Sequence, residues 1–276
     1  MMDQTLYSLL KSVDTPSVCN AIEVAQSKRG FDHYTRGTPL ISDPAGVMVG
    51  YARTARIAAL APPTDPADEI RARRMGYYKY MSEGPRPAVC VVEDADGAAA
   101  VGAYWGEVNT NIHKAFGLQG TLTNGVMRDL GDLAPDYPVV AGSIGPSHAF
   151  VHVLDYDQPV TVFGLNVSPG DLIHADRHGA VVIPPEVIPN LAGAIATMQG
   201  AEQIVFDAVK GKRITFADFE AAWAAFEEDD KGTLSVGKLA DVVVLSQDLL
   251  TVPEEELQGT EVLMTIVGGE LRFRAE

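Results

Sequence analysis

Hydrophobic positions in the first third of the chain switch between helical and strand spacing. Apolar residues recur every three or four positions at 6–13 and again at 18–25, and Thr15-Pro16 between them supplies an N-cap and a first-turn proline. An alternating strand, a charged helix and an entirely apolar strand follow, at 47–58, 67–81 and 88–92. A strand without polar alternation is typical of a sheet that is covered on both faces. The pattern therefore predicts an α/β fold.

The next segment predicts a strand–helix–strand unit. Gly102 and Gly106 precede a helix that ends at Gly117, and a short strand follows at 120–123. The apolar side of this helix is expected to carry Val108, Ile112, Ala115 and Phe116. Since a crossover helix joins parallel strands, we expect strands 88–92 and 120–123 to be parallel.

Short strand patterns, separated by Gly and Pro turns, dominate the following part of the chain. They predict a sheet or a small barrel and lie at 138–141, 149–154, 160–163, 171–174 and 180–183. Pro184-Pro185 then opens a long amphipathic helix that reaches Val209, and Thr215 caps another helix that reaches Phe226.

The composition changes sharply after Phe226. Residues 227–232 form a charge run that ends in glycine, which is typical of a linker. We therefore expect one domain at 1–226, followed by an acidic linker and a β segment at 227–276. This last part holds 12 acidic and 4 basic residues, and so carries half of the formal net charge of −16.

The acidic balance argues against a nucleic acid or an anionic membrane as partner. A local basic cluster, at Arg71, Arg73 and Arg74, is diluted by neighbouring acids and is interpreted as a solvated helix face. Cys19 and Cys90 lie in apolar surroundings and predict buried hydrophobes rather than a disulfide framework. The chain shows neither a basic leader nor an apolar run of about 20 residues, so we expect a cytoplasmic protein.

The stretch 120–129 carries the strongest chemical signal. A strand ends in Asn124-Gly125, and Arg128 and Asp129 follow at the edge where open α/β sheets place ligands. Arg128 offers a fork of donors for a carboxylate or a polarised carbonyl, and Asp129 offers the hard oxygen that Mg²⁺ or Mn²⁺ prefers. The alternative interpretation is that Asp129 caps the helix that follows and Arg128 pairs with a surface acid.

Residues 102–111 add a second signal. Gly106 precedes a helix whose first backbone N–H groups can bind an anion without a basic side chain. Glu107 lies in the first turn, where the helix dipole favours a carboxylate. It is interpreted either as a dipole-stabilising surface residue or as the carboxylate that holds a metal-bound water.

Three motifs in this order resemble one protein family. They are Trp105-Gly106-Glu107-Val108-Asn109, Asn124-Gly125-Val126-Met127-Arg128-Asp129 and the segment from Ser168 to Pro184. They resemble the family named for the regulator of ribonuclease activity A, which also contains 4-hydroxy-4-methyl-2-oxoglutarate aldolases. The resemblance extends over about residues 6–214. It implies a swivelling β/β/α-type domain, with mixed sheets flanked by helices, that assembles as a homotrimer or a hexamer (a dimer of trimers) with sites between subunits.

The resemblance also implies roles for individual residues. Asp129 matches the aspartate that positions a divalent metal, Mg²⁺ or Mn²⁺, directly or through water. Arg128 matches the arginine that binds the oxygens of a keto-acid substrate. The turn from Gly106 through Val108 to Asn109 matches the backbone amides that hold the pyruvyl carboxylate.

Two acids complete the set that the resemblance implies. Glu107 stands where aldolase members commonly carry aspartate, and its longer side chain would orient a metal-bound water. Glu202 is the match for an acid that reaches in from the neighbouring subunit. Because binding members of the family lack a complete set of acids, the presence of Arg128, Asp129 and an acid at position 107 favours an enzyme.

These roles indicate a metal-dependent carbon–carbon lyase, either an aldolase or an oxaloacetate decarboxylase. Its reaction leaves a pyruvate enolate, whose charge a metal and Arg128 would stabilise. Water held by Glu107 would protonate the enolate carbon or serve the hydroxyl group on the other side of the bond. The competing hypothesis is a non-catalytic binding protein that inhibits a ribonuclease.

Two further features receive structural interpretations. His174, Asp176 and His178 alternate as metal ligands on a strand would, but residues 176–179 are typical of a turn, so we interpret them as turn and interface residues. His148 and His152 are likewise taken as structural. Residues 237–246, 249–253 and 262–269 resemble the C-terminal strands of metal-dependent amidohydrolases. They predict two to three strands, packed on the core or on a neighbouring subunit, without a catalytic residue.

Overall fold

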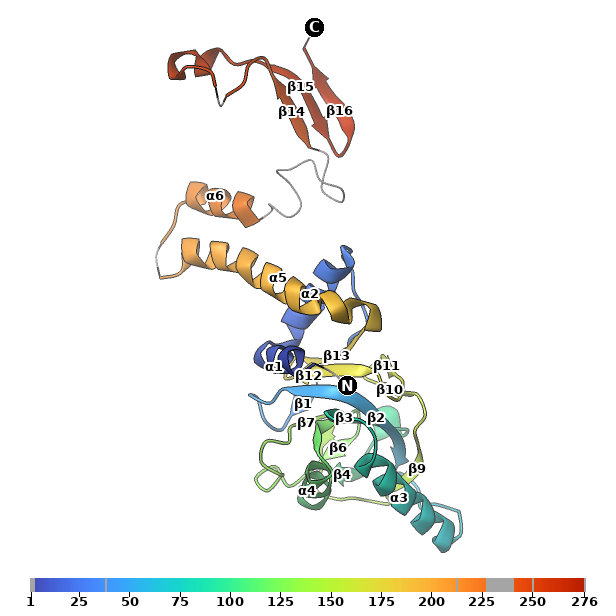
Figure 1. Ribbon diagram of the computed structural model, residues 1–276. Helices are drawn as coiled ribbons and strands as arrows, with labels where there is room; N and C mark the ends of the chain where they lie inside the picture. Colours follow the sequence, from blue (N-terminus) through green and yellow to red (C-terminus); the bar gives the residue numbers. More distant parts are fainter. Residues whose placement is uncertain (1–2, 38, 212, 227–240, 250, 276) are drawn as a thin grey trace. The chain divides into compact units, whose positions relative to one another are not determined.

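A mixed eight-stranded sheet organises the larger part of the computed structural model, which describes residues 3–37, 39–211, 213–226, 241–249 and 251–275. The chain divides into two units, which meet in sequence inside helix α5 (Ile188–Val209), between Ile195 and Ala196. Figure 1 shows the elements of each unit, and each is described by itself.

The sheet of the first unit has the strand order β1-β7-β5-β3-β2-β12-β13, with β9 added beside β2. The strand bounds are Leu40–Ile41 (β1), Met48–Ala58 (β2), Ala88–Asp94 (β3), Leu118–Thr123 (β5), Val139–Ala141 (β7), His152–Tyr156 (β9), Leu172–Asp176 (β12) and Gly179–Ile183 (β13). Strands β2, β3, β5 and β7 are parallel neighbours. The parallel pairing of β3 with β5 confirms the predicted strand–helix–strand unit.

Strand β2 is long enough to have two neighbours on the same edge. Its first half pairs with β12 and its second half with β9, both antiparallel, while β3 pairs along the opposite edge. Strands β12 and β9 thus form two branches, and the sheet curls into a half-barrel that helices flank (Figure 1). This architecture confirms the swivelling β/β/α-type fold with mixed sheets that the sequence predicted.

Strand β3 is buried on both faces, as its apolar run predicted. Val89 and Val91 contact a cluster that includes the hairpin of β10 (Val160–Val162) and β11 (Leu165–Val167). Cys90 and Val92 contact the cluster on the other side, under helix α3 (Ala67–Ser82). Successive residues of a strand point to opposite faces, so one strand serves two cores. Both cysteines are free, Cys90 buried and Cys19 half-buried.

Helices α1 (Gln4–Ser12) and α2 (Thr15–Gln26), with the first turns of α5, cover β12 and β13 (Figure 1). The carboxylate of Asp14 caps α2, because its Oδ1 accepts a hydrogen bond of 3.0 Å from the amide of Ser17. The prediction that Thr15 is the N-cap is therefore wrong by one residue. The amide of Thr15 donates instead to Oδ2 of Asp176, at 2.9 Å.

A small parallel sheet, which the sequence did not predict, has the order β4-β6-β8. Its strands are Ala103–Trp105 (β4), Val126–Met127 (β6) and Ser143–Ile144 (β8). They are too short to show the alternation on which a sequence-based prediction depends. Strand β4 leads through Gly106 into helix α4 (Glu107–Ala115), and β6 leads directly to Arg128.

Helix α4 buries only part of the face that the sequence predicted, because Phe116 packs against the core and Ile112 is half-buried, but Val108 and Ala115 are exposed. Its buried residues are Thr110 and His113, whereas Val108 is 67% exposed. Two polar residues can face the core here because their side chains are hydrogen-bonded, His113 to Tyr77 and Thr110 to backbone groups.

The second unit contains the remainder of α5, helix α6 (Phe216–Phe226), the 3-10 turn η3 (Glu254–Gly259) and an antiparallel sheet. The sheet has the order β14-β15-β16, with bounds Val242–Leu245, Val262–Val267 and Glu270–Arg274. These strands confirm the predicted C-terminal β segment. Thr215 caps α6, as predicted, through its hydroxyl and the amide of Asp218.

The predicted linker, 227–232, lies outside the described residues, and the domain boundary at 226/227 stays a prediction. Within the described ranges, no helix combines the length and the apolar character that crossing a membrane requires.

Candidate functional site

The sequence-predicted residues Gly106, Glu107, Arg128 and Asp129 come together at one end of the small parallel sheet. Trp105 at the end of β4 pairs with Met127 at the end of β6, so the residues that follow these strands are neighbours. The amide of Arg128 donates to the carbonyl oxygen of Trp105 at 2.8 Å and continues this pairing by one residue. The topology thus places residues 22 positions apart at one carboxyl edge.

The carboxylate of Asp129 caps helix α4. Its Oδ2 accepts a hydrogen bond of 3.1 Å from the amide of Glu107, the first residue of the helix. The alternative interpretation of the sequence was that Asp129 caps a helix that follows it. That interpretation is wrong, because residues 130–132 form a turn. Asp129 itself adopts a left-handed backbone conformation, with φ of 55°, and its carbonyl accepts from the amide of Asp132 at 2.9 Å.

Gly106 is required here by space rather than by backbone conformation. Its φ of −142° is open to any residue. A Cβ atom at this position, however, would overlap Oδ2 of Asp129 and lie 3.0 Å from both Cγ and Nε of Arg128. The absence of a side chain at Gly106 therefore allows the Arg128-Asp129 pair to lie directly against the helix terminus.

Arg128 has donors to spare. Its Nε lies 3.4 Å from Oδ2 of Asp129, an ion pair between side chains that are 32% and 37% exposed. The same Nε is buried and has no hydrogen-bond partner among the described residues. No described hydrogen bond engages the two Nη atoms of Arg128, so these outer donors are available to an anionic ligand with a planar carboxylate.

The first turn of α4 also presents free backbone donors. The helix ladder begins with the amide of Thr110, which donates to the carbonyl of Gly106 at 3.0 Å. The amide of Glu107 is used by Asp129, whereas the described residues provide no acceptor for the amides of Val108 and Asn109. These two amides belong to the turn from Gly106 to Asn109, to which the family resemblance assigned carboxylate binding.

The side chain of Asn109 has a structural role. Its Nδ2 donates to the carbonyl of Tyr104 at 2.6 Å, and its Oδ1 accepts from the hydroxyl of Tyr78 at 2.7 Å. The carbonyl of Asn109 is 2.6 Å from Nδ1 of His113, whose Nε2 is 2.6 Å from the hydroxyl of Tyr77. Burial lowers the pKa of His113 to about 4, so its ring is neutral, with Nδ1 donating and Nε2 accepting.

These contacts hold the first turn of α4 rigidly against the aromatic core. Sequence reasoning did not assign a role to Thr110, His113, Tyr77 or Tyr78. Only one signal for them was available, the spacing of four between Asn109 and His113, which places both on one side of a helix.

The donors of the site fit a hard divalent cation only in part within a single chain. The described residues contain no group of three or more His, Cys, Asp or Glu side chains arranged to hold a metal. Mg²⁺ commonly takes one or two carboxylates and completes its shell with water and substrate oxygens. Asp129 meets that need, because its Oδ1 is not engaged by any described hydrogen bond. The residue whose amide Asp129 binds, Glu107, adds a second carboxylate and is exposed.

Glu202, the predicted acid from a neighbouring subunit, lies on α5 within the second unit and is half-buried. Its role stays a prediction.

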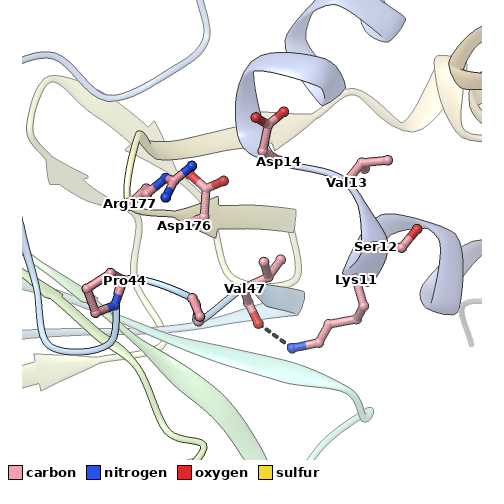
Figure 2. Close-up of a pocket in the computed structure, with 10 residues that line it drawn as sticks. Lys11, Ser12, Val13, Asp14, Pro44, Val47, Asp176 and Arg177 are labelled. Atoms are coloured by element: carbon pink, nitrogen blue, oxygen red, sulfur yellow. Dashed lines mark hydrogen bonds between the residues drawn. The ribbon is translucent and has the colours of Figure 1, made fainter. Parts of the chain in front are cut away.

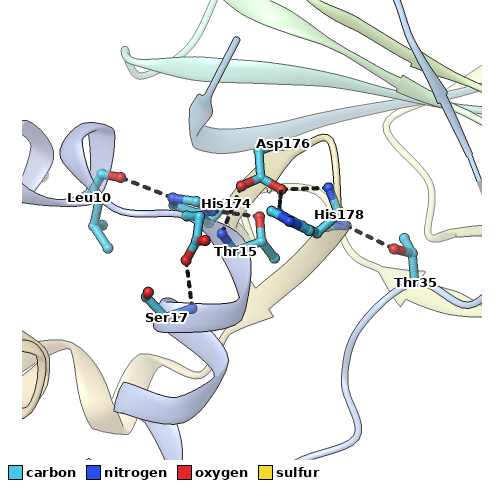
Figure 3. A network of polar contacts seen from close by, with 9 residues as sticks. Leu10, Thr15, Ser17, Thr35, His174, Asp176 and His178 are labelled. Carbon is cyan, nitrogen blue, oxygen red and sulfur yellow. Dashed lines mark hydrogen bonds and ion pairs between the residues drawn. The ribbon is translucent and has the colours of Figure 1, made fainter. Parts of the chain in front are cut away.

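The alternating residues His174, Asp176 and His178 form a structural network (Figure 3). His174 is buried, with Nε2 2.9 Å from the carbonyl of Leu10 and Nδ1 3.0 Å from the hydroxyl of Thr15, and burial lowers its pKa. Asp176 accepts from the amides of Thr15 and His178. Asp176 ends β12 and residues 177–178 form the turn to β13, as predicted, whereas the interface role stays a prediction. The exposed His148 and the half-buried His152 each contact a nearby carbonyl.

A cavity of about 330 Å³ lies beside this network, between the α1–α2 turn and the 43–47 loop (Figure 2). Lys11 and Arg177 line it together with Asp14 and Asp176. Lys11 donates to the carbonyl of Val47, Asp14 caps α2 and Asp176 is fully hydrogen-bonded. Since three of these four charged groups are already paired within the protein, the cavity is a weaker candidate than the Arg128-Asp129 site.

Residues 15–182 match the RraA-like family model, described as Aldolase/RraA, and this match covers more than half of the chain. Residues 219–273 match a model of the amidohydrolase family. Among curated proteins, Protein DlpA of Legionella pneumophila is 23% identical over 133 residues, which cover 47% of this chain and 21% of DlpA. The chain spans less than half the length of the curated relatives that it matches.

Two solved structures share the fold. An uncharacterized protein from Pseudomonas syringae pv. tomato has a TM-score of 0.60 at 20% identity, covering 80% of this chain and 98% of that chain. RraAS2 of Streptomyces coelicolor, described as an unusual member of the RNase ES inhibitor RraA protein family, has a TM-score of 0.54 at 25% identity. That comparison covers 73% of this chain and 93% of RraAS2.

Proposed function

Because the chain belongs to the RraA-like family, described as Aldolase/RraA, we propose that it is a carbon–carbon lyase that depends on Mg²⁺ or Mn²⁺. Its substrate would be a 4-hydroxy-2-keto acid or a 4-carboxy-2-keto acid, and its product pyruvate. The observation that carries this proposal is the convergence of Arg128, Asp129 and the N-terminus of α4, joined by the 3.1 Å hydrogen bond between Glu107 and Asp129.

Substrate binding falls to Arg128 and to the first turn of α4. The carboxylate of the keto acid would accept hydrogen bonds from the amides of Val108 and Asn109, which lack described acceptors, and the helix dipole favours an anion there. The guanidinium of Arg128 would donate from its Nη atoms to the keto oxygen and to one carboxylate oxygen. In this arrangement the C3–C4 bond of the substrate would face Glu107.

The chemical step breaks the C3–C4 bond, and the electron pair remains on the pyruvyl fragment as an enolate. In the aldolase reaction the C4 hydroxyl loses its proton and becomes a carbonyl, whereas in the decarboxylase reaction CO₂ leaves. Protonation at C3 then gives pyruvate. Arg128 stabilises the enolate oxygen, and a water oriented by Glu107 moves the proton.

Asp129 would hold the divalent ion, and Glu107 would contact it through water. When bound, the ion supplies a Lewis acid beside the keto oxygen. Glu107 in place of the aspartate that is common in aldolases lengthens the reach of this carboxylate by one methylene, which suits a water-mediated contact.

We also propose that the protein works as a homotrimer or as a hexamer formed from two trimers, with Glu202 supplied by the neighbouring subunit. Exposed apolar side chains flank the site and support this assembly. Val108 follows Glu107, Leu130 follows Asp129, and Ile144 lies on β8 opposite Met127. Apolar side chains around a polar site are typical of a surface that a second subunit covers.

The second candidate function is a non-catalytic ribonuclease regulator, favoured by the 25% identity to RraAS2 over most of its length. The two candidates differ in their dependence on Asp129. A lyase loses activity when the carboxylate is removed, whereas a binding protein of the regulator type keeps its partner.

A coupled assay distinguishes the two. Pyruvate release from oxaloacetate and from 4-hydroxy-4-methyl-2-oxoglutarate is followed with lactate dehydrogenase and NADH, with Mg²⁺, with Mn²⁺ and with EDTA. The proposal expects turnover that EDTA and D129A both abolish. Absence of turnover on both substrates with either metal overturns the lyase proposal and leaves the regulator.

A further inference from the structure

Thr110 is a buried polar residue directly behind the candidate site. Its side chain is inaccessible to solvent, and its Oγ1 lies 2.9 Å from the carbonyl oxygen of Gly106. The same Oγ1 accepts a hydrogen bond of 3.1 Å from the amide of Ala134. The hydroxyl thus donates to the start of its own helix and accepts from a different segment of the chain.

That segment, 128–134, carries Arg128 and Asp129. Three hydrogen bonds join it to β4 and α4: Arg128 amide to Trp105 carbonyl, Glu107 amide to Asp129 carboxylate, and Ala134 amide to Thr110 hydroxyl. The first bond fixes where the segment begins and the last fixes where it ends. Between them the backbone turns through the left-handed conformation of Asp129.

Thr110 is the anchor at the far end of this turn. Residues 129–132 are exposed, and apart from the ion pair with Arg128 the only side-chain contact described for Asp129 is the one to Glu107. The position of the Asp129 carboxylate therefore depends on how the two ends of the turn are held. A left-handed non-glycine residue costs free energy, and it persists only where its surroundings enforce it.

We propose that Thr110 is a positioning residue of the candidate site, and that its hydroxyl holds the 128–134 turn so that the Asp129 carboxylate reaches its working position. This inference rests on the proposed lyase function for its kinetic consequence. Thr110 touches neither substrate nor metal, and it acts through Ala134 and Gly106.

Two substitutions separate the hydroxyl from the volume of the side chain. T110V keeps the shape and removes both the donor and the acceptor, so the buried amide of Ala134 loses its partner and the turn must move to find water. T110S keeps the hydroxyl and removes only a methyl group. T110A removes the hydroxyl and leaves room for a water, which provides a third variant should T110V fail to fold.

Thr35 offers a matched control. It is also buried, and its Oγ1 also accepts a backbone amide, that of Ala180, at 2.9 Å. It lies next to the β12–β13 hairpin (Figure 3), and no described hydrogen bond joins it to the candidate site. T35V therefore removes an equivalent hydrogen bond without touching the 128–134 turn.

The kinetic test compares KM, kcat and the Mn²⁺ concentration for half-maximal pyruvate release in the full-length protein. We expect T110V and T110A to raise KM and the Mn²⁺ requirement by about tenfold, with T110S within about twofold of the wild type. T35V is expected to lower the melting temperature as T110V does and to leave both constants unchanged. A T110V protein with a lower melting temperature and unchanged constants would overturn the inference, because Thr110 would then only stabilise the fold.

A second readout needs no turnover. Hydrogen exchange at the amide of Glu107 reports directly on the bond to Asp129 and is expected to quicken in T110V and T110A, but not in T110S or T35V. If the wild type releases no pyruvate, the lyase proposal fails while this measurement still decides the role of Thr110. Unchanged exchange at Glu107 in T110V and T110A would contradict the positioning role whatever the activity.

Discussion

The carboxylate of Asp129 accepts a hydrogen bond of 3.1 Å from the backbone amide of Glu107, the first residue of α4. This bond explains why the Arg-Asp dipeptide and the glycine-containing turn occur together in the sequence. The helix terminus orients the carboxylate of Asp129, and this carboxylate in turn accepts a hydrogen bond from one of the free amides of the terminus. The remaining two amides and the guanidinium of Arg128 are left for a ligand.

Gly106 is predicted to tolerate no side chain without loss of the site. A Cβ in G106A would overlap Oδ2 of Asp129 and press on Arg128, so both side chains must move away from the helix terminus. We expect kcat/KM for pyruvate release to fall by about a hundredfold, which corresponds to about 3 kcal/mol of lost transition-state stabilisation. Steady-state kinetics with the coupled assay measures the change.

Gly193 provides the control for this substitution. It lies inside α5, and a Cβ there meets nothing within 4 Å, so G193A is expected to leave kcat/KM unchanged and to raise stability slightly. Equal activity of G106A and G193A would show that the Arg128-Asp129 pair is not needed against the helix terminus.

The planar fork of Arg128 is predicted to matter beyond its charge. R128K keeps a cation but replaces paired donors with a single ammonium group, which cannot bind two oxygens of a keto acid side by side. We expect KM to rise by at least about tenfold in R128K. R71K, at an exposed position of α3, is the control and should behave as the wild type. Wild-type KM in R128K would argue against bidentate substrate binding.

The sequence was sufficient to predict those site residues that are adjacent in the chain or that follow a recognisable strand or helix start. Arg128 and Asp129 are adjacent and come soon after the apolar strand β5, and Glu107 follows a glycine that marks a helix start. The fold class followed from the apolar run of β3 and from the resemblance carried by three motifs. These features are local, so they can be recognised in the sequence without knowledge of the tertiary contacts.

The supporting residues could not be predicted in the same way. Thr110 and His113 lie on a helix face that hydrophobic spacing assigned to solvent, because spacing counts apolar residues and ignores buried polar ones. Each is buried because a distant group completes its hydrogen bonds, the amide of Ala134 for Thr110 and the hydroxyl of Tyr77 for His113. The cap of α4 by Asp129 likewise joins residues 22 positions apart.

His113 is predicted to destabilise the protein as the pH falls. Burial lowers its pKa from 6.5 to about 4 in the folded state, so between these values the unfolded chain binds a proton that the folded chain does not. The free energy of unfolding should decrease by about 3 kcal/mol from this residue as the pH drops from 7 to 4. Urea denaturation at several pH values, compared with H113Q, measures this contribution.

H33Q serves as the reference for that comparison, because the ring of His33 is 70% exposed. It should keep the pH dependence of the wild type, whereas H113Q should flatten it. If the wild type and H113Q lose stability equally between pH 7 and pH 4, His113 is not held neutral by burial.

Asp94 is predicted to make the protein less stable as the pH rises, which is the opposite of the effect of His113. Removal of the Asp94 charge should therefore raise the free energy of unfolding. It ends β3 with a side chain that is almost fully buried, its Oδ1 accepts from the amide of Asp96 at 3.0 Å, and its Oδ2 has no partner among the described residues. Burial, with a smaller contribution from the charge of Asp96, raises the pKa of Asp94 from 3.8 to about 6. Above this pKa the folded protein carries a poorly solvated carboxylate that the unfolded chain solvates freely, so the free energy of unfolding attributable to Asp94 falls as the pH rises from 4 through 6.

The isosteric variant D94N tests this directly. Asparagine keeps an oxygen for the amide of Asp96 and has no charge, so D94N should be more stable than the wild type by about 3 kcal/mol at pH 8 and should lose this advantage at pH 4. D155N is an informative contrast, because the carboxylate of Asp155 is paired with Arg56 on neighbouring strands β9 and β2, and its loss should destabilise at pH 8. Thermal unfolding of the wild type, D94N and D155N at pH 4 and pH 8 measures these differences. A D94N protein that is less stable than the wild type at pH 8 would mean that the Asp94 carboxylate has a favourable partner in the folded state.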